Sequence, residues 1–194
     1  IRELAAQLDL KPSKSLGQNF VIDSNVCTKI VRTAGVTSDD IALEIGPGLG
    51  SLTLAMLEIA KSVIAVEIDP RLAQQLPITV AQHYEHPENL TVINKDALAV
   101  NDLPVDPTVL VANLPYNVSV PVLLHLLEKF PSIRTGVVMV QAEVADRLAA
   151  KPGGKEYGIP SVKAAWWADV KNVGTVSRSI FWPAPNVDSK LVGF

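Results

Sequence analysis

The sequence predicts an α/β protein in which helices cover both faces of a mostly parallel sheet. Short apolar runs alternate with helical patterns along most of the 194 residues. A glycine-rich turn, Gly46-Pro47-Gly48-Leu49-Gly50, follows the first run directly, and an acidic residue, Glu67, ends the second. Strand, glycine turn and helix in this order form a nucleotide-binding unit. The glycines let the backbone approach a ligand, and the free N–H groups of the helix face it.

Three elements are expected before the sheet. Residues 1–10 have the pattern of a short amphipathic helix. Residues 11–20 combine proline, glycine and small polar side chains, which indicates an irregular arm. Asp23 or Ser24 is expected to cap a helix that runs to about Ala34.

The remaining elements alternate as a parallel sheet requires. We expect strands at 41–45, 62–67, 90–94, 108–112, 136–141, 168–176 and 187–194. Helices are expected at 51–60, 71–84, 118–130, 142–150 and 157–167. Pro77 should end or kink the second of these helices near Leu76, because proline lacks the N–H group that continues a helix.

The glycine spacing separates two classes of cofactor. A dinucleotide fingerprint has glycine at its first, third and sixth positions, but here the sixth is Ser51 and the third glycine, Gly50, comes one residue early. This tighter turn favours an adenosine with a small charged tail, as in S-adenosylmethionine, over a nicotinamide cofactor. Glu67, twenty-one positions beyond Gly46, then suits a ribose diol. Asp96 either binds the adenine amino group or caps the next turn.

The tetrapeptide Asn113-Leu114-Pro115-Tyr116 follows the strand at 108–112 directly. Open α/β sheets bind their ligands at the carboxyl ends of strands. There, the Asn113 amide oxygen and the Leu114 carbonyl can accept both N–H bonds of an adenine amino group while Tyr116 stacks on the ring. The alternative is a loop in which Asn and Pro only turn the chain.

Phe181 and Trp182 lie in a proline-rich link at 179–189. Its prolines stiffen the segment, so we expect it to present one of the two rings at the sheet edge, where a flat base would be held against Tyr116. The alternative is an aromatic plug packed under the loop, and for Trp182 the sequence leaves both interpretations open. The segment at 151–155, with two lysines, two glycines and a proline, is expected to form a flexible loop that acts as a mobile lid or a phosphate contact.

Composition and charge exclude several classes of protein. Hydrophobic residues make up 48% of the chain, and no apolar run is long enough for a membrane span. One cysteine, Cys27, excludes an internal disulfide, and three scattered histidines argue against structural zinc, so we expect no metal and a reducing cytoplasm. The net charge of −3 counts against a nucleic-acid binder. From Arg147 to Lys190, however, seven Lys or Arg stand against three acidic residues, a local excess of four.

Six segments, in order along the chain, resemble the small-subunit (16S-type) ribosomal RNA adenine N6,N6-dimethyltransferase family. They are Ser15-Leu16-Gly17-Gln18-Asn19-Phe20, Glu44-Ile45-Gly46-Pro47-Gly48-Leu49-Gly50, Glu67-Ile68-Asp69, Lys95-Asp96-Ala97, Asn113-Leu114-Pro115-Tyr116 and Phe181-Trp182-Pro183-Ala184-Pro185-Asn186-Val187-Asp188-Ser189. The resemblance implies a class I S-adenosylmethionine-dependent methyltransferase: a Rossmann-like, seven-stranded, mostly parallel sheet whose last strand is antiparallel. It also implies dimethylation of N6 on two adjacent adenines near the 3′ end of small-subunit RNA, linked to ribosome assembly.

The resemblance also implies roles for individual residues. The family's cofactor contacts fall on Asn19, Val21, Gly46, Gly48, Glu67, Ile68, Asp96, Ala97 and Asn113. The target-adenine pocket, which holds the expected catalytic residues, falls on Asn113, Leu114, Tyr116 and Phe181. Family arms commonly have leucine in place of Val21, but that contact is made by the backbone.

The domain organisation and the setting follow from the same resemblance. Residues 1–194 are expected to form the catalytic domain with an N-terminal arm at 1–20, and both ends of the chain look cut. The chain stops before the small, basic, helical C-terminal domain of the family, which accounts for the net charge and weakens the case for RNA affinity. The expected partner is small-subunit RNA in a pre-assembled subunit, bound by a cytoplasmic monomer.

Other functions fit parts of the pattern. The chain could be a large-subunit RNA methyltransferase of the antibiotic-resistance type or a DNA adenine methyltransferase, although DNA enzymes usually have proline in place of Leu114. A non-catalytic RNA-binding assembly factor is a third alternative. Such a binder has no need of both the glycine turn and the Asn113-Leu114-Pro115-Tyr116 segment, and both are intact.

Overall fold

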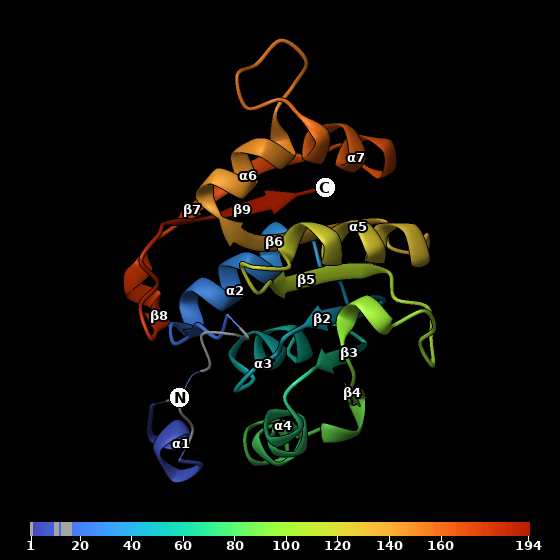
Figure 1. Cartoon of the computed structure of the whole chain (residues 1–194). Coiled ribbons are helices and arrows are strands. Elements are labelled where there is room, and N and C mark those ends of the chain that lie inside the picture. Colours follow the sequence, from blue (N-terminus) through green and yellow to red (C-terminus); the bar gives the residue numbers. More distant parts are fainter. Residues whose placement is uncertain (1, 10–11, 13–16) are drawn as a thin grey trace.

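The structure, a computed structural model, describes residues 2–9, 12 and 17–194. Its centre is a seven-stranded sheet with the strand order β4-β3-β2-β5-β6-β9-β7 (Figure 1). The strands are β2 Ile41–Ile45, β3 Ser62–Glu67, β4 Leu90–Asn94, β5 Val109–Asn113, β6 Thr135–Gln141, β7 Lys171–Val176 and β9 Ser189–Gly193. β9 is antiparallel to β6 and β7, and the other neighbouring pairs are parallel. The expected sheet, with its antiparallel last strand, is confirmed.

Three helices cover each face of this sheet (Figure 1). On one face lie α2 Ser24–Thr33, α3 Ser51–Leu57 and α4 Pro70–His83, and on the other α5 Ser119–Lys129, α6 Ala142–Ala149 and α7 Ile159–Trp167. Successive strand residues alternate between the two layers, since Val109 packs in the first and Leu110 in the second. The central strands are mainly apolar because both of their faces are buried, and Glu44 in β2 is an exception.

The described part of the N-terminus agrees with the expected helix only in part. α1 spans Arg2–Gln7, and Ile1 and Leu10 lie outside the described residues. Residues 11 and 13–16 of the arm also lie outside them, and the last two of these begin the family-like segment Ser15-Leu16-Gly17-Gln18-Asn19-Phe20. The expected cap of α2 is confirmed, because the Asp23 carboxylate accepts hydrogen bonds from two backbone N–H groups of the first turn.

Pro77 was expected to end or kink the helix, and the first of these alternatives is wrong, while a kink stays a prediction. α4 continues through this residue to His83. The proline ring is exposed, while Leu76 and Val80 on either side of it are buried at 1% and 0% exposure. Burial of both flanking turns against the sheet offsets the single hydrogen bond that proline removes.

Two segments expected to be irregular form a second small sheet. β1 Phe20–Val21 in the arm pairs antiparallel with β8 Phe181–Trp182 in the proline-rich link. The rings of Phe20 and Trp182 stack with centroids 6.2 Å apart and planes inclined by 22°. Pairings so distant in sequence leave no local pattern, which explains why the strands were missed.

The stretch from Arg147 to Lys190 has a smaller excess of positive charge in the folded structure than in the sequence. Four of its seven basic residues form ion pairs, namely Arg147 with Glu143, Lys151 with Asp169, Arg178 with Asp188, and Lys190 with Asp146. Two of these partners, Glu143 and Asp146, precede the counted stretch, so the local excess of positive charge shrinks. In the part of the chain that the structure describes, no helix has the length and apolar character needed to cross a membrane.

A single glycine sets how closely β5, β6 and the chain end approach. A carbon added at Gly136 would overlap the carbonyl oxygen of Leu110 and the ring of Phe194. We therefore expect Gly136→Ala to lower the free energy of unfolding by about 1–3 kcal/mol, measured by urea denaturation. The control is Gly174→Ala in β7, where the added carbon would lie 3.5 Å from Leu191, an ordinary contact. Equal destabilisation by both variants would contradict the packing argument.

Candidate active site

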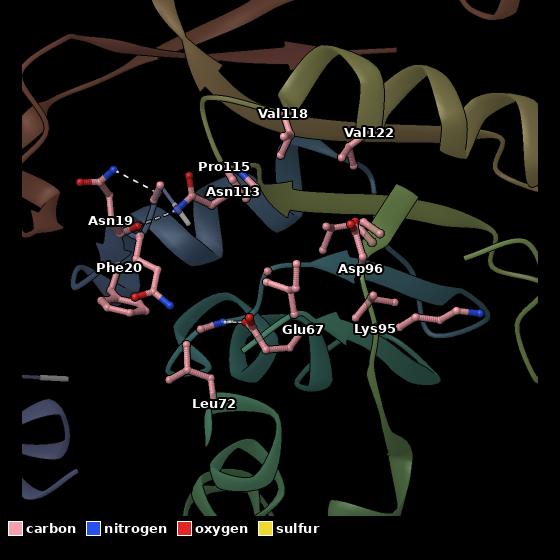
Figure 2. A pocket seen from close by; sticks show the side chains of 18 residues that line it. Asn19, Phe20, Glu67, Leu72, Lys95, Asp96, Asn113, Pro115, Val118 and Val122 are labelled. Carbon is pink, nitrogen blue, oxygen red and sulfur yellow. Dashed lines mark hydrogen bonds between the residues drawn. The ribbon is translucent and has the colours of Figure 1, made fainter. Parts of the chain in front are cut away.

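The main pocket lies where the order of the strands reverses. β2 has β3 on one side and β5 on the other, and the helices that follow β2 and β5 cover opposite faces. This arrangement opens a crevice at the carboxyl ends of the strands. Figure 2 shows how the side chains of its wall converge. The lining is Gly17, Gln18, Asn19, Phe20, Ile45, Gly46, Gly48, Val66, Glu67, Ile68, Leu72, Lys95, Asp96, Ala97, Asn113, Pro115, Val118 and Val122.

The structure brings together nearly all the residues expected to bind the cofactor. Apart from Val21, every one of them lines this pocket. Val21 borders a smaller adjacent pocket that shares Asn19, Phe20, Gly46 and Asn113 with the first. The Val21 carbonyl accepts a hydrogen bond from the Ser51 hydroxyl at 2.6 Å, which holds the arm on the start of α3.

The glycine turn needs glycine at its first and third positions. Gly46 and Gly48 have φ angles of +67° and +57°, a region that side chains rarely adopt. A carbon added to Gly48 would also lie 2.7 Å from the ring of Phe20 in the arm. The turn therefore packs closely against the arm, and its backbone forms part of the pocket wall.

Glu67 ends β3 with a buried carboxylate, 4% exposed. Its Oε2 accepts a hydrogen bond from the Gly48 N–H at 3.1 Å, and its Oε1 accepts one from the Asp69 N–H at 2.9 Å. Burial raises the pKa of this carboxyl, while the two N–H groups oppose the rise. Each oxygen keeps a second lone pair, so the side chain can still accept hydrogen bonds from a ribose diol.

The far end of the pocket suits an adenine ring. Val66, Val118 and Val122 supply apolar walls, and Asp96 lines the same pocket. Figure 2 labels Val118, Val122 and Asp96. The Asp96 carboxylate accepts a hydrogen bond from the Leu98 N–H at 2.9 Å, which confirms that it caps a short turn. Its contact with a cofactor stays a prediction. Apolar walls together with the carboxylates of Glu67 and Asp96 fit an adenosine.

The arm closes the pocket through Asn113. The Nδ2 of Asn113 donates to the backbone carbonyl of Asn19 at 2.9 Å, and the Asn19 side chain donates to the Gly17 carbonyl at 3.3 Å (Figure 2). On the opposite side, Gln18 donates to the Asp69 carboxylate at 3.4 Å. The arm therefore bridges the ends of β3 and β5.

One residue expected in the target-adenine pocket, Phe181, is less exposed than the sequence indicated. The Leu114 side chain is fully buried, and the Tyr116 hydroxyl lies 2.6 Å from Ser189 Oγ, with burial raising the pKa of the phenol. Phe181 is 3% exposed and packs in the core beneath the arm, so the expectation of an exposed ring at the pocket rim is wrong for it. Pairing with Val21 in the small sheet turns its side chain inward. Trp182 is packed against Phe20, as the plug interpretation requires.

Sequence reasoning missed Glu44, which borders the smaller pocket. Its side chain is 1% exposed and accepts a hydrogen bond from the Thr53 hydroxyl at 2.5 Å. Burial raises the pKa of Glu44 to about 8, and the nearby charge of Glu67 adds to this effect. One signal was available, since an acidic residue within an otherwise apolar buried strand is rare without a role.

Sequence reasoning also missed the apolar part of the lining. Phe20, Leu72, Val118 and Val122 form pocket walls. Apolar residues of this kind are equally common in a plain core, so their pattern carries no signal of a binding site. Among the described residues, no group of three or more His, Cys, Asp or Glu is placed to hold a metal ion.

This fold and pocket define the class of Rossmann-like methyltransferases that use S-adenosylmethionine. A fibrillarin from Aeropyrum pernix, solved with S-adenosylmethionine bound, superposes with a TM-score of 0.60 over 88% of this chain and 72% of that one. At 15% sequence identity, this likeness shows the fold alone.

The sequence comparison identifies the particular family. The chain belongs to the ribosomal RNA adenine dimethylase family, whose profile matches residues 10–194. It is 64% identical to the ribosomal RNA small subunit methyltransferase A of Leifsonia xyli subsp. xyli, over 100% of this chain and 70% of that protein. It is 62% identical to the protein of the same name from Streptomyces avermitilis, over 99% of this chain and 66% of that protein. The chain thus spans about two thirds of the length of these relatives.

Two solved structures support this assignment. A dimethyladenosine transferase from Plasmodium falciparum has a TM-score of 0.79 and 34% identity, over 90% of this chain and 62% of that one. The 23S rRNA methyltransferase ErmE has a TM-score of 0.76 and 32% identity, over 90% of this chain and 68% of that one. The family resemblance and the cofactor class expected from the sequence are both confirmed.

Loss of the Glu67 carboxylate should weaken cofactor binding. Hydrogen bonds to a charged group contribute about 1.5–3 kcal/mol each, so we expect Glu67→Ala to raise the Kd for S-adenosylmethionine at least about tenfold in calorimetric titration. Glu88→Ala, at a side chain that is 68% exposed, is the control and should bind like the wild type. An unchanged Kd in Glu67→Ala, with its circular dichroism unaltered, would remove Glu67 from the ribose contact.

Burial of Glu44 should make folding stability depend on pH. Between pH 4.5 and about 8 the unfolded chain releases this proton while the folded chain keeps it. Wild-type stability should therefore fall as pH rises through this window, with a slope of up to about 1.4 kcal/mol per pH unit. Glu44→Gln keeps an oxygen for Thr53 and should show a flatter profile in urea denaturation. Parallel profiles for the two proteins would contradict the raised pKa.

Proposed function

We propose that this chain transfers methyl groups from S-adenosylmethionine to N6 of two adjacent adenines near the 3′ end of small-subunit ribosomal RNA, giving N6-dimethyladenosines. The observation that carries the proposal is the position of Asn113, whose amide lies at the junction of the cofactor pocket, the arm and the tetrapeptide loop. High identity to two small-subunit methyltransferases supports the RNA substrate. The cofactor supplies an activated methyl group on a sulfonium.

The chain's own residues bind and orient the amine. The Asn113 oxygen and the Leu114 carbonyl accept its two N–H bonds, which makes the nitrogen more nucleophilic and directs its lone pair. The target base must leave its RNA stack to reach this position, and Tyr116 offers a ring for it to stack on. Positioning accounts for most of the rate, and no strong base is required because the nitrogen becomes acidic once alkylated.

The setting of the reaction is part of the same proposal. Residues 1–194 act as the catalytic domain, with 1–20 as its N-terminal arm, and the enzyme works as a cytoplasmic monomer on RNA within a pre-assembled subunit. The relatives are longer than this chain. A basic helical domain of the kind found in the family would add phosphate contacts, which supply much of the affinity for RNA.

A second candidate is methylation of large-subunit RNA. The likeness to ErmE favours it, since the two chains share the fold over 90% of this one. The identity to ErmE is 32%, about half the 64% shared with the small-subunit enzyme of Leifsonia xyli subsp. xyli. Incubation with small and large ribosomal subunits, followed by mass spectrometry of the nucleosides, separates the two candidates. N6-dimethyladenosine in large-subunit RNA alone would overturn the proposal.

Removal of the Asn113 amide should slow methyl transfer and spare the fold. We expect Asn113→Ala to lower kcat on small subunits by about a hundredfold or more, because the amine loses one of its two orienting acceptors. Its Kd for S-adenosylmethionine should change much less, since the other pocket contacts persist. Asn101→Ala, at an exposed asparagine, is the matched control. Turnover near that of the wild type would exclude Asn113 from the mechanism.

A further inference from the structure

We propose that the described end of the arm, residues 17–22, takes part directly in the methyl-transfer site. The backbone carbonyl of Asn19 holds the Asn113 amide in the one orientation that presents its oxygen to the target amine. This inference rests on the proposed function and deepens it. It makes Asn19 a positioning residue, which acts on the substrate through Asn113, in addition to its expected contact with the cofactor.

The chemistry of the hydrogen bond fixes how the amide lies. Asn113 Nδ2 and the Asn19 carbonyl oxygen are 2.9 Å apart. A carbonyl oxygen can only accept a hydrogen bond, so the NH2 end of the amide must face the arm. The amide oxygen then points away from the arm and is available to accept an N–H bond from the amine. A flipped amide would set two oxygens against each other and offer the amine a donor.

Without the Asn19 carbonyl, this hydrogen bond would be absent and would no longer fix which end of the Asn113 amide faces the amine. The terminal torsion of an asparagine side chain is broad and roughly two-fold, so its two ends exchange places readily. The Asn19 carbonyl removes this freedom before the substrate arrives. Orientation fixed in advance is a main source of catalytic rate, because no reorganisation is needed during the reaction.

The arm is itself held firmly enough to serve this purpose. The Ile22 N–H donates to the Ile180 carbonyl at 2.8 Å, next to the β1/β8 pair. The ring of Phe20 stacks on Trp182 and also rests on Gly48 of the glycine turn. Gly17, with a φ of +62°, packs so closely on the tetrapeptide loop that an added carbon would lie 3.2 Å from Asn117 Oδ1 and 3.5 Å from Pro115 Cβ.

The same arm residues also line the cofactor pocket. Gly17, Gln18, Asn19 and Phe20 form one of its walls. The cofactor side and the amine side of the reaction therefore share one segment of backbone. Docking of the arm and orientation of Asn113 become a single event, and an undocked arm leaves the amine without its fixed acceptor.

Hydrogen exchange tests the link between the arm and Asn113 without any RNA. Asn113→Asp keeps the shape and the acceptor oxygens but cannot donate to the Asn19 carbonyl. We expect backbone amides of residues 17–22 to exchange at least about tenfold faster in this variant, since local opening becomes easier. Asn94→Asp is the matched control, because Asn94 Nδ2 donates to a backbone carbonyl, that of Glu67 at 2.7 Å, at another strand end. Its arm should exchange like the wild type, and equal arm exchange in all three proteins would overturn the proposal.

Kinetics test the consequence for catalysis. Gly17 and Gly35 both have positive φ, +62° and +71°, but an added carbon at Gly35 meets nothing within 4 Å. We expect Gly17→Ala to lower kcat on small subunits at least about tenfold with KM for RNA within about threefold, and Gly35→Ala, which carries the same backbone strain, to keep the wild-type kcat. Equal kcat values in the two variants would overturn the positioning role.

The two failures are distinguishable. If the wild-type protein methylates no adenine in either subunit, the proposed function fails, and the exchange experiment still decides whether Asn113 holds the arm. If the wild type is active while arm exchange in Asn113→Asp equals that of the wild type, or kcat in Gly17→Ala equals that of Gly35→Ala, the function stands and the arm proposal fails.

Discussion

Burial of the sheet on both faces is the constraint on which the rest of this structure depends. The central strands pack against helices on either side, so their interior positions hold almost only apolar side chains. Polar groups that do chemistry can emerge only where a strand ends. Glu67 ends β3 and Asn113 ends β5, and parallel pairing with β2 brings both strand ends to one edge. The position of the site therefore follows from the parallel pairing of these strands.

The arm and the proline-rich link form the second level of organisation. They lie at opposite ends of the sequence, yet they pair as β1 and β8 and stack Phe20 on Trp182. This pairing buries Phe181 and sets the arm across the pocket. A glycine turn, an arm and a loop that each have little rigidity alone are fixed by mutual contact. Their shared geometry explains why family-like segments are spread along the whole chain.

Buried carboxylates give this site an electrostatic cost. Glu44 and Glu67 are 1% and 4% exposed, and the pKa of each is raised by burial. A core made only for stability would not contain them, because desolvating an ionised carboxylate is unfavourable. Hydrogen bonds from two backbone N–H groups offset part of the desolvation of Glu67. At Glu44, one hydrogen bond from the Thr53 hydroxyl does the same. Such groups typically mark a binding site.

The sequence by itself determined the order of strands and helices along the chain, the glycine turn and the cofactor class, because these follow from local periodicity and from residues next to strand ends. The family resemblance added most of the residues expected to contact the cofactor, whereas the apolar part of the pocket lining carried no signal. Tertiary structure decided the rest. α4 runs through Pro77 because both flanking turns are buried, and Phe181 turns inward because its strand pairs with the arm. The Asn113 to Asn19 contact joins residues far apart in the chain. Long-range packing and pairing have no local signature, so only the folded chain reveals them.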